Sequence, residues 1–185
     1  MAKMKITELP LKGAYTIDLE IQEDNRGFFA RYFCKKEFEK YGLSTHWVQM
    51  NTSLSQKKGT FRGLHYQSPP MAEVKVVRCL RGAIWDVIVD IRANSPTYGE
   101  WHGQNLNEEN RTMIYVPKGF AHGFQTLTDN AEQLYLNSEF YSPNHEGGLR
   151  HDDPALKIPC PLPISEISIQ DQNHPLLAQL IPIMV

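Results

Sequence analysis

The chain lacks several features that would mark it as a secreted, membrane-bound or disulfide-stabilised protein. It has 185 residues, and its three cysteines, Cys34, Cys79 and Cys160, lie far apart and outside any CxxC spacing. It contains no run of about eighteen or more apolar residues, and residues 1–8 carry no apolar core of signal-peptide length. We therefore expect free thiols, a cytoplasmic location and no membrane partner.

An excess of charge of one sign is also missing. Lys and Arg number 19 and Asp and Glu number 21, which gives a formal net charge of −2. This balance provides no general attraction to nucleic acid or to a membrane surface, so an anionic ligand would need a local basic site. The 7 histidines include no His-x-His pair, the arrangement that metal-dependent β-barrel enzymes usually place on one strand. We predict no metal ion, no cofactor and no nucleic-acid partner.

The chain does contain a succession of short segments in which apolar and polar residues alternate. In residues 83–91 the odd positions are all apolar, whereas the even positions alternate between isoleucine and aspartate, which predicts a strand with one apolar and one mixed face. Helices are predicted at 35–42, closed by a glycine, and at 173–180. Residues 1–185 are therefore predicted to form one all-β domain, a sandwich or barrel. Further strands are predicted at 15–19, 61–66, 74–80, 101–106, 113–116, 123–127 and 133–137.

The segment with the richest chemistry is residues 62–67 (RGLHYQ), which is followed by Lys75. A histidine can remove a proton next to a carbonyl, and a nearby cation can stabilise the oxyanion that forms. A regular strand would place Arg62 and His65 on opposite faces, but Gly63 could permit a bulge that relieves this separation. The segment alone fits a catalytic histidine and a core histidine with satisfied hydrogen bonds equally well.

Other candidates are ambiguous when each is taken by itself. His122 lies in residues 117–124 (PKGFAHGF), whose proline and glycines suit a binding site or a structural turn. Tyr135 lies on a mixed strand face and fits a core tyrosine or an acid. Asp171 fits a helix cap or a turn. Residues 24–31 (DNRGFFAR) combine arginine with aromatic rings, which suits a phosphate and a flat ring, or an ordinary strand start.

Taken together, these segments resemble the dTDP-4-dehydrorhamnose 3,5-epimerase family, sugar-nucleotide epimerases of the cupin superfamily. The resemblance covers roughly residues 24–177 and implies an all-β double-stranded β-helix (cupin or jelly-roll) barrel with a few short helices. It also implies a metal-free homodimer whose substrate is a nucleoside diphosphate joined to a 4-keto-6-deoxyhexose. The motifs that carry it, in the order and spacing of the family, are RGFF at 26–29, QMN at 49–51, RGLHYQ at 62–67, DVIVD at 86–90, SPTYG at 95–99, GFAHGF at 119–124 and DDP at 152–154.

The resemblance also implies roles for individual residues. His65 matches the base of the family, and Asp171 matches the carboxylate that orients this base. Lys75 matches the cation near the enolate oxygen, and Tyr135 matches the acid that returns a proton to the opposite face of the sugar. Positions that match the family's contacts to the diphosphate, sugar and nucleotide are Arg26, Phe29, Gln49, Asn51, Arg62, His122, Tyr141 and Glu146.

The chain departs from the family pattern at two positions near these motifs. Arg31 stands where the family usually has a glutamate, and Gln170 stands where it usually has a lysine before Asp171. If Arg31 points toward the nucleotide, a base with more hydrogen-bond acceptors than thymine, such as cytosine, becomes plausible. If it points outward, nothing follows for the base.

Three alternatives to a 3,5-epimerase stay open at this point. One is a single-carbon 3- or 5-epimerase that acts on a CDP-linked or other deoxy ketosugar. Another is a ketoisomerase or a metal-dependent cupin oxygenase, although the missing His-x-His pair argues against the oxygenase. The last is a non-catalytic sugar-nucleotide-binding cupin, which we would expect to have lost the base or the acid.

Overall fold

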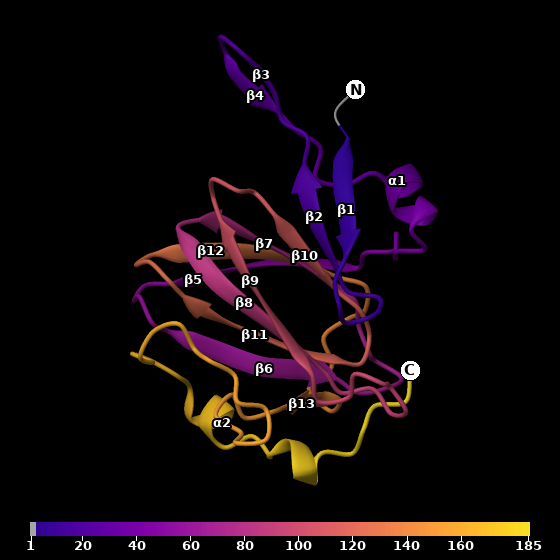
Figure 1. The fold of residues 1–185 in the computed structure, drawn as a ribbon, viewed down its shortest axis with the longest axis vertical. Helices are drawn as coiled ribbons and strands as arrows, with labels where there is room; N and C mark the ends of the chain where they lie inside the picture. The colour runs from indigo at the N-terminus through magenta and orange to yellow at the C-terminus, as the bar shows by residue number, and fades with distance from the viewer. Residues whose placement is uncertain (1–2) are drawn as a thin grey trace.

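The computed structural model describes residues 3–185, whose strands form two large antiparallel sheets that pack face to face as a barrel (Figure 1). One sheet has six strands, in the spatial order β1 (Met4–Glu8), β2 (Tyr15–Leu19), β10 (Met113–Val116), β7 (Lys75–Arg81), β12 (Ala131–Asn137) and β5 (Gln49–Ser55). The other has five strands, in the order β13 (Glu146–Gly148), β6 (Phe61–Gln67), β11 (Phe120–Thr126), β8 (Ala83–Asp90) and β9 (Trp101–Asn107). The all-β prediction is confirmed, although sequence alternation did not predict β1, β5 or β13.

Apolar side chains from both sheets fill the space between them. Val77 of β7, Ile114 of β10, Ile88 of β8 and Phe124 of β11 belong to this interior cluster, and each is at most 4% exposed. Burying a side chain of this size contributes about 1.5–3 kcal/mol relative to leaving it in water. Every one of these residues lies in a segment whose alternation predicted a strand.

The C-terminal segment covers the outer face of the five-stranded sheet, where Val87 and Val89 pack against Leu156 (Figure 1, yellow). It contains the short helix α2 (Ile169–Gln172) and the 3₁₀ turn η1 (Leu177–Gln179). The helix predicted at 173–180 is therefore wrong. Pro175 explains the difference, because it has no N–H to donate and it disfavours helical backbone at the residue before it.

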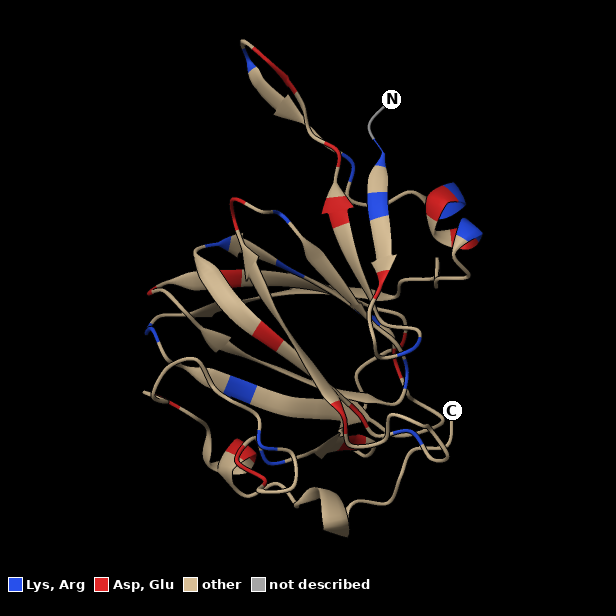
Figure 2. Cartoon of the chain, in the orientation of Figure 1, with Lys and Arg blue, Asp and Glu red and all other residues tan. Residues whose placement is uncertain are grey.

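A hairpin of β3 (Gln22–Asp24) and β4 (Gly27–Phe29) projects from the barrel, and all six of its strand residues are exposed (Figure 1). The helix α1 (Lys35–Lys40) follows it, as predicted, and carries charges of both signs (Figure 2). Gly42 closes this helix with a φ of 68°, a conformation that costs glycine little. None of the helices in residues 3–185 combines the length and apolarity needed to cross a bilayer.

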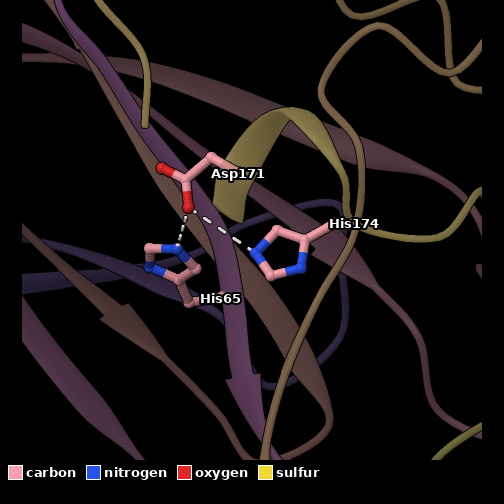
Figure 3. Close-up of side chains that lie close together, drawn as sticks. All are labelled: His65, Asp171 and His174. Carbon is pink, nitrogen blue, oxygen red and sulfur yellow. Dashed lines mark hydrogen bonds and ion pairs between the residues drawn. The ribbon is translucent and has the colours of Figure 1, made fainter. Parts of the chain in front are cut away.

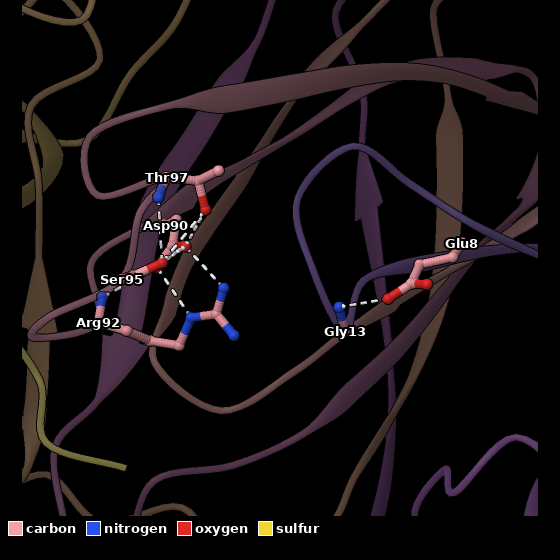
Figure 4. Close-up of polar contacts among 6 residues, drawn as sticks. All are labelled: Glu8, Gly13, Asp90, Arg92, Ser95 and Thr97. Atoms are coloured by element: carbon pink, nitrogen blue, oxygen red, sulfur yellow. Dashed lines mark hydrogen bonds and ion pairs between the residues drawn. The ribbon is translucent and has the colours of Figure 1, made fainter.

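A buried carboxylate anchors the loop that follows β8 (Figure 4). Asp90 is fully buried and accepts hydrogen bonds from the guanidinium of Arg92 at 2.6 and 2.9 Å and from the hydroxyls of Ser95 and Thr97 at 2.6 Å each. Burial alone would raise the pKa of Asp90, but these donors outweigh it and lower the pKa. Asp90, Arg92, Ser95 and Thr97 thus fix the conformation of this loop.

Candidate active site

A bulge in β6 brings two polar side chains of this strand to the same side of the sheet. In the pairing of β11 with β6, His122 lies opposite His65 and Phe124 opposite Arg62, so β6 holds one extra residue between them. Gly63 makes this possible, since its φ is 124° and a Cβ there would lie 2.6 Å from the Cα of Gly123. Arg62 and His65 consequently line the same cavity, through the bulge that the sequence left open at Gly63.

His65 is held by a carboxylate from a distant part of the chain (Figure 3). Its Nε2 lies 2.7 Å from Oδ1 of Asp171, the buried residue of α2. The other oxygen of Asp171 accepts the backbone N–H of Gly63 at 3.1 Å, and Ser168 caps α2 by accepting the backbone N–H of Asp171 at 3.0 Å. The structure therefore joins the base and the carboxylate that the family resemblance paired.

The protonation state of this pair follows from the same contacts. Burial would raise the pKa of Asp171, but the hydrogen bond and charge of His65, together with the bonds to Gly63 and Ser168, lower it below its ordinary value. Asp171 is thus ionised near neutral pH, and an ionised carboxylate only accepts hydrogen bonds. In the neutral imidazole tautomer that suits this contact, Nε2 of His65 donates to Asp171 and the lone pair lies on Nδ1.

The six-stranded sheet contributes the groups that face His65 across the barrel. Lys75 begins β7 and Tyr135 lies in the neighbouring strand β12. Burial is the main cause that raises the pKa of Tyr135, so the phenol keeps its proton near neutral pH. These two residues and His65 line both of the cavities inside the barrel, of about 190 and 360 Å³.

Lys75 is positioned by a polar chain that sequence reasoning missed. Its Nζ lies 3.1 Å from Oε1 of Glu73, and both side chains are mostly buried. The other oxygen of Glu73 accepts from Asn137 at 2.7 Å, and Asn137 in turn accepts from Asn51 at 3.3 Å. Glu73 could have been noticed from the sequence, because it stands two residues before Lys75.

The larger cavity opens on the nucleotide-side residues that the resemblance predicted. Gln49, Asn51, Tyr141 and Glu146 all line it. The amide oxygen of Gln49 accepts the backbone N–H of Tyr141 at 2.6 Å, and the hydroxyl of Tyr141 donates to Glu146 at 2.9 Å. The hydrogen bond to Glu146 is the main cause that raises the pKa of Tyr141. The structure thus brings four of the predicted binding residues together beside His65.

A second histidine–aspartate pair lies deeper in the same region. Nε2 of His122 is 2.8 Å from Oδ2 of Asp86, and Asp86 is fully buried on β8. His122 also lines the 190 Å³ cavity together with Arg62 and Lys75. These side chains give the interior cavity the local basic character that an anionic ligand needs.

Three predicted binding residues are not brought to the site within one chain. Arg26 pairs with Asp24 on the exposed hairpin, and Phe29 is 60% exposed. Arg31 lies 3.4 Å from Glu37 of α1 and lines neither interior cavity. Within this chain, Arg31 therefore contacts α1 and does not face the substrate cavity.

Comparisons with known proteins decide the family. A family model described as dTDP-4-dehydrorhamnose 3,5-epimerase matches residues 8–179. The chain belongs to this family. The enzyme of that name from Methanothermobacter thermautotrophicus is 42% identical over 94% of each chain, and a dTDP-4-dehydrorhamnose 3-epimerase from Streptomyces niveus is 37% identical over 95% of this chain and 85% of its own. The Legionella pneumophila epimerase, solved in complex with dTDP-4-keto-L-rhamnose, superposes with a TM-score of 0.90 at 39% identity, covering 97% of this chain and 95% of its own.

Membership in the dTDP-4-dehydrorhamnose 3,5-epimerase family confirms two predictions made from the sequence. The barrel is of the cupin or jelly-roll kind, with only short helices. The protein is an isomerase of the carbohydrate epimerase type.

Proposed function

We propose that the protein epimerises dTDP-4-dehydro-6-deoxy-D-glucose, a nucleoside diphosphate 4-keto-6-deoxyhexose, at C3 and C5. One observation carries this proposal. A base on the five-stranded sheet, His65 with Asp171, shares a cavity with an acid and a cation, Tyr135 and Lys75, that the six-stranded sheet supplies. Inversion at carbon needs a proton removed from one face and returned to the other, and groups on opposing sheets can flank the sugar in this way.

In the proposed first step, Nδ1 of His65 takes the proton next to the C4 ketone. The C–H electron pair forms a C=C bond and the carbonyl pair moves to oxygen, which gives an enolate. Asp171 stabilises the imidazolium through the hydrogen bond at Nε2. General-base catalysis of this kind contributes about 10²–10⁴-fold to the rate.

In the same scheme, the ammonium of Lys75 stabilises the enolate oxygen. Glu73 fixes its position at 3.1 Å, so little rearrangement is needed when the charge develops. Preorganised donors of this type are worth roughly 3–4 kcal/mol in other enzymes. Removal of the cation should therefore slow both exchange and inversion.

Tyr135 completes the reaction by donating its phenolic proton to the opposite face of the carbon. Its raised pKa keeps the proton in place until the enolate forms. The enolate electron pair forms the new C–H bond, and the tyrosinate regains a proton afterwards. Repetition of these steps at the second carbon would give the doubly inverted product.

We also assign the remaining binding residues and a homodimer within this proposal. Arg62 and His122 suit the diphosphate and sugar, whereas Gln49 and Tyr141 suit the nucleotide. Arg26 and Phe29 lie on the hairpin that projects from the barrel, and neither lines the interior cavities, which suits contact with a second copy. A cytoplasmic location is part of the same proposal, since the three cysteines are free.

Deuterium incorporation tests the proposal. The purified protein is incubated with dTDP-4-keto-6-deoxyglucose in D₂O, and C3 and C5 are followed by NMR and mass spectrometry. Deuterium at both carbons with inversion is the expected result. Deuterium at C3 alone would favour a single-carbon epimerase, as the Streptomyces niveus relative is named. If nothing exchanges, the thymidine substrate is wrong, and the CDP-linked ketosugar becomes the next probe.

A further inference from the structure

One buried histidine near the dyad has no part in the proposed reaction. His174 follows α2, and its side chain is only 10% exposed. Its Nε2 lies 3.5 Å from Oδ1 of Asp171, beyond an ordinary hydrogen bond, and has no hydrogen-bond partner among the described residues. A buried nitrogen without a hydrogen-bond partner destabilises the folded protein. A bound ligand at this position would satisfy the nitrogen.

Two neighbours hold the imidazole ring of His174 in place. Gly148 of β13 lies directly beneath it, and a Cβ at Gly148 would come within 2.2 Å of ring atoms of His174. On its other side the ring meets His65 edge-on, with 5.7 Å between centroids. The imidazole is therefore fixed with Nε2 directed at the carboxylate that also holds His65, as Figure 3 shows.

The three side chains present a donor set that suits a transition metal. One ligand atom from each of His65, Asp171 and His174 lies within 4.8 Å of the other two. Two imidazoles and a carboxylate are common ligands of Zn²⁺, whose tetrahedral bonds of about 2.0–2.1 Å place donor atoms roughly 3.3 Å apart. The 2.7 Å contact between His65 and Asp171 would have to open slightly, and the widest separation would have to shorten.

Open space beside the cluster also suits a metal. His65 and Asp171 line a groove of about 800 Å³, which leaves room for a fourth ligand.

We propose that His65, Asp171 and His174 form a binding site for Zn²⁺ or Co²⁺ that switches the enzyme off. In the active dyad, Nε2 of His65 carries the hydrogen and Nδ1 accepts the substrate proton. Metal coordination at Nε2 moves that hydrogen to Nδ1, so the ring stays neutral but loses its basic lone pair. The inhibitory part of this inference rests on the proposed role of His65, whereas the metal site itself does not.

The test is a titration of chelator-treated protein with Co²⁺, followed by visible absorption and calorimetry. One Co²⁺ per chain should bind the wild type with the spectrum of four-coordinate cobalt. His174→Gln removes a metal ligand and should weaken Co²⁺ affinity by about 100-fold or more. Loss of a residue that only hydrogen-bonds to a metal ligand already lowers metal affinity by up to about 100-fold. His46→Gln, at an exposed histidine outside this cluster, should bind as the wild type does. His174→Asn is a second variant, and circular dichroism checks that each variant is folded.

Activity is then measured with and without the metal. Stoichiometric Zn²⁺ or Co²⁺ should abolish epimerisation by the wild type, and chelation should restore it, whereas His174→Gln should keep its basal rate and resist inhibition. Equal Co²⁺ affinity of the wild type and His174→Gln, or no binding by the wild type at micromolar metal, would overturn the site. Binding that depends on His174 but leaves the rate unchanged would overturn the inhibition alone. Since binding is measured without substrate, an inactive protein would refute the proposed function and not the site.

Discussion

The two histidine–aspartate pairs of the barrel have nearly equal contact lengths and very different surroundings. His65 and Asp171 lie 2.7 Å apart, the histidine side chain is 35% exposed, and the carboxylate comes from the C-terminal segment. His122 and Asp86 lie 2.8 Å apart, the histidine side chain is 10% exposed, and both residues belong to paired strands of one sheet. A histidine–aspartate pair of the same geometry can therefore suit proton transfer in one place and stabilisation of the barrel in another.

The difference lies in how much open space each histidine borders. His65 lines all three of the cavities near the dyad, so its side chain can meet substrate. His122 lines only the smallest of these cavities, and the fully buried carboxylate of Asp86 holds its ring in place. We therefore assign proton transfer to His65 and substrate positioning to His122, and the changes below should separate these roles.

The largest effect is expected from His65→Asn. This change removes the base while keeping a polar side chain of similar size, so kcat should fall by about 10²–10⁴-fold. The matched change His122→Asn should mainly raise KM for the sugar nucleotide. Steady-state kinetics on both variants check this. An equal loss of kcat in both would contradict the assignment of proton transfer to His65 and of substrate positioning to His122.

Asp171→Asn should produce the next largest effect. An amide can no longer act as an ionised acceptor for Nε2, so the correct tautomer of His65 loses its stabilisation and kcat should fall by about 10²-fold. Asp86→Asn should change kcat by less than about tenfold, because the pair to which it belongs only positions substrate. The kinetic account of the dyad fails if Asp171→Asn retains full kcat.

Asp86→Asn should instead affect stability. Asp86 is fully buried, and a weaker contact with His122 should lower the free energy of unfolding by about 1–3 kcal/mol. Urea denaturation followed by tryptophan fluorescence measures the change. A variant as stable as the wild type would show that this pair is not part of the framework.

The smallest expected effect is on the stability of the folded protein at acidic pH. The pKa of Asp171 is lowered in the folded protein, so its contribution to stability is complete above the unfolded value of about 3.9 and is lost as the pH falls toward the folded value. The wild type should therefore lose more stability below about pH 4 than Asp171→Asn does. Thermal melts from pH 6 to pH 3 measure this, and parallel curves for the two proteins would contradict the lowered pKa.

Much of the framework could be predicted from sequence, and the exceptions have a physical cause. Gly63 between Arg62 and His65 pointed to a bulge as one option, and the structure has it there. In contrast, β5 was missed because its pattern is inverted: Met50 and Leu54 are exposed, while polar residues such as Asn51 turn toward the cavity. A strand that lines a polar site does not show the apolar inward face on which the prediction depends.

The site was harder to predict because its members come from separate elements. Asp171 lies 106 residues after His65, and only the family resemblance linked them. Glu73 and His174 were missed although each stands within three residues of Lys75 or Asp171, because neither belongs to a motif that carried the family resemblance. Nothing in the local sequence shows that Gly148 makes room for the ring of His174.

The most direct test of the central claim, a base and an acid on opposing sheets, is proton exchange by Tyr135→Phe in D₂O compared with His65→Asn. With His65 intact and the acid removed, Tyr135→Phe should still exchange protons next to the C4 ketone but should return them without inversion. His65→Asn should do neither. Loss of exchange in Tyr135→Phe to the level of His65→Asn, or rapid exchange by His65→Asn itself, would contradict the assignment of base and acid.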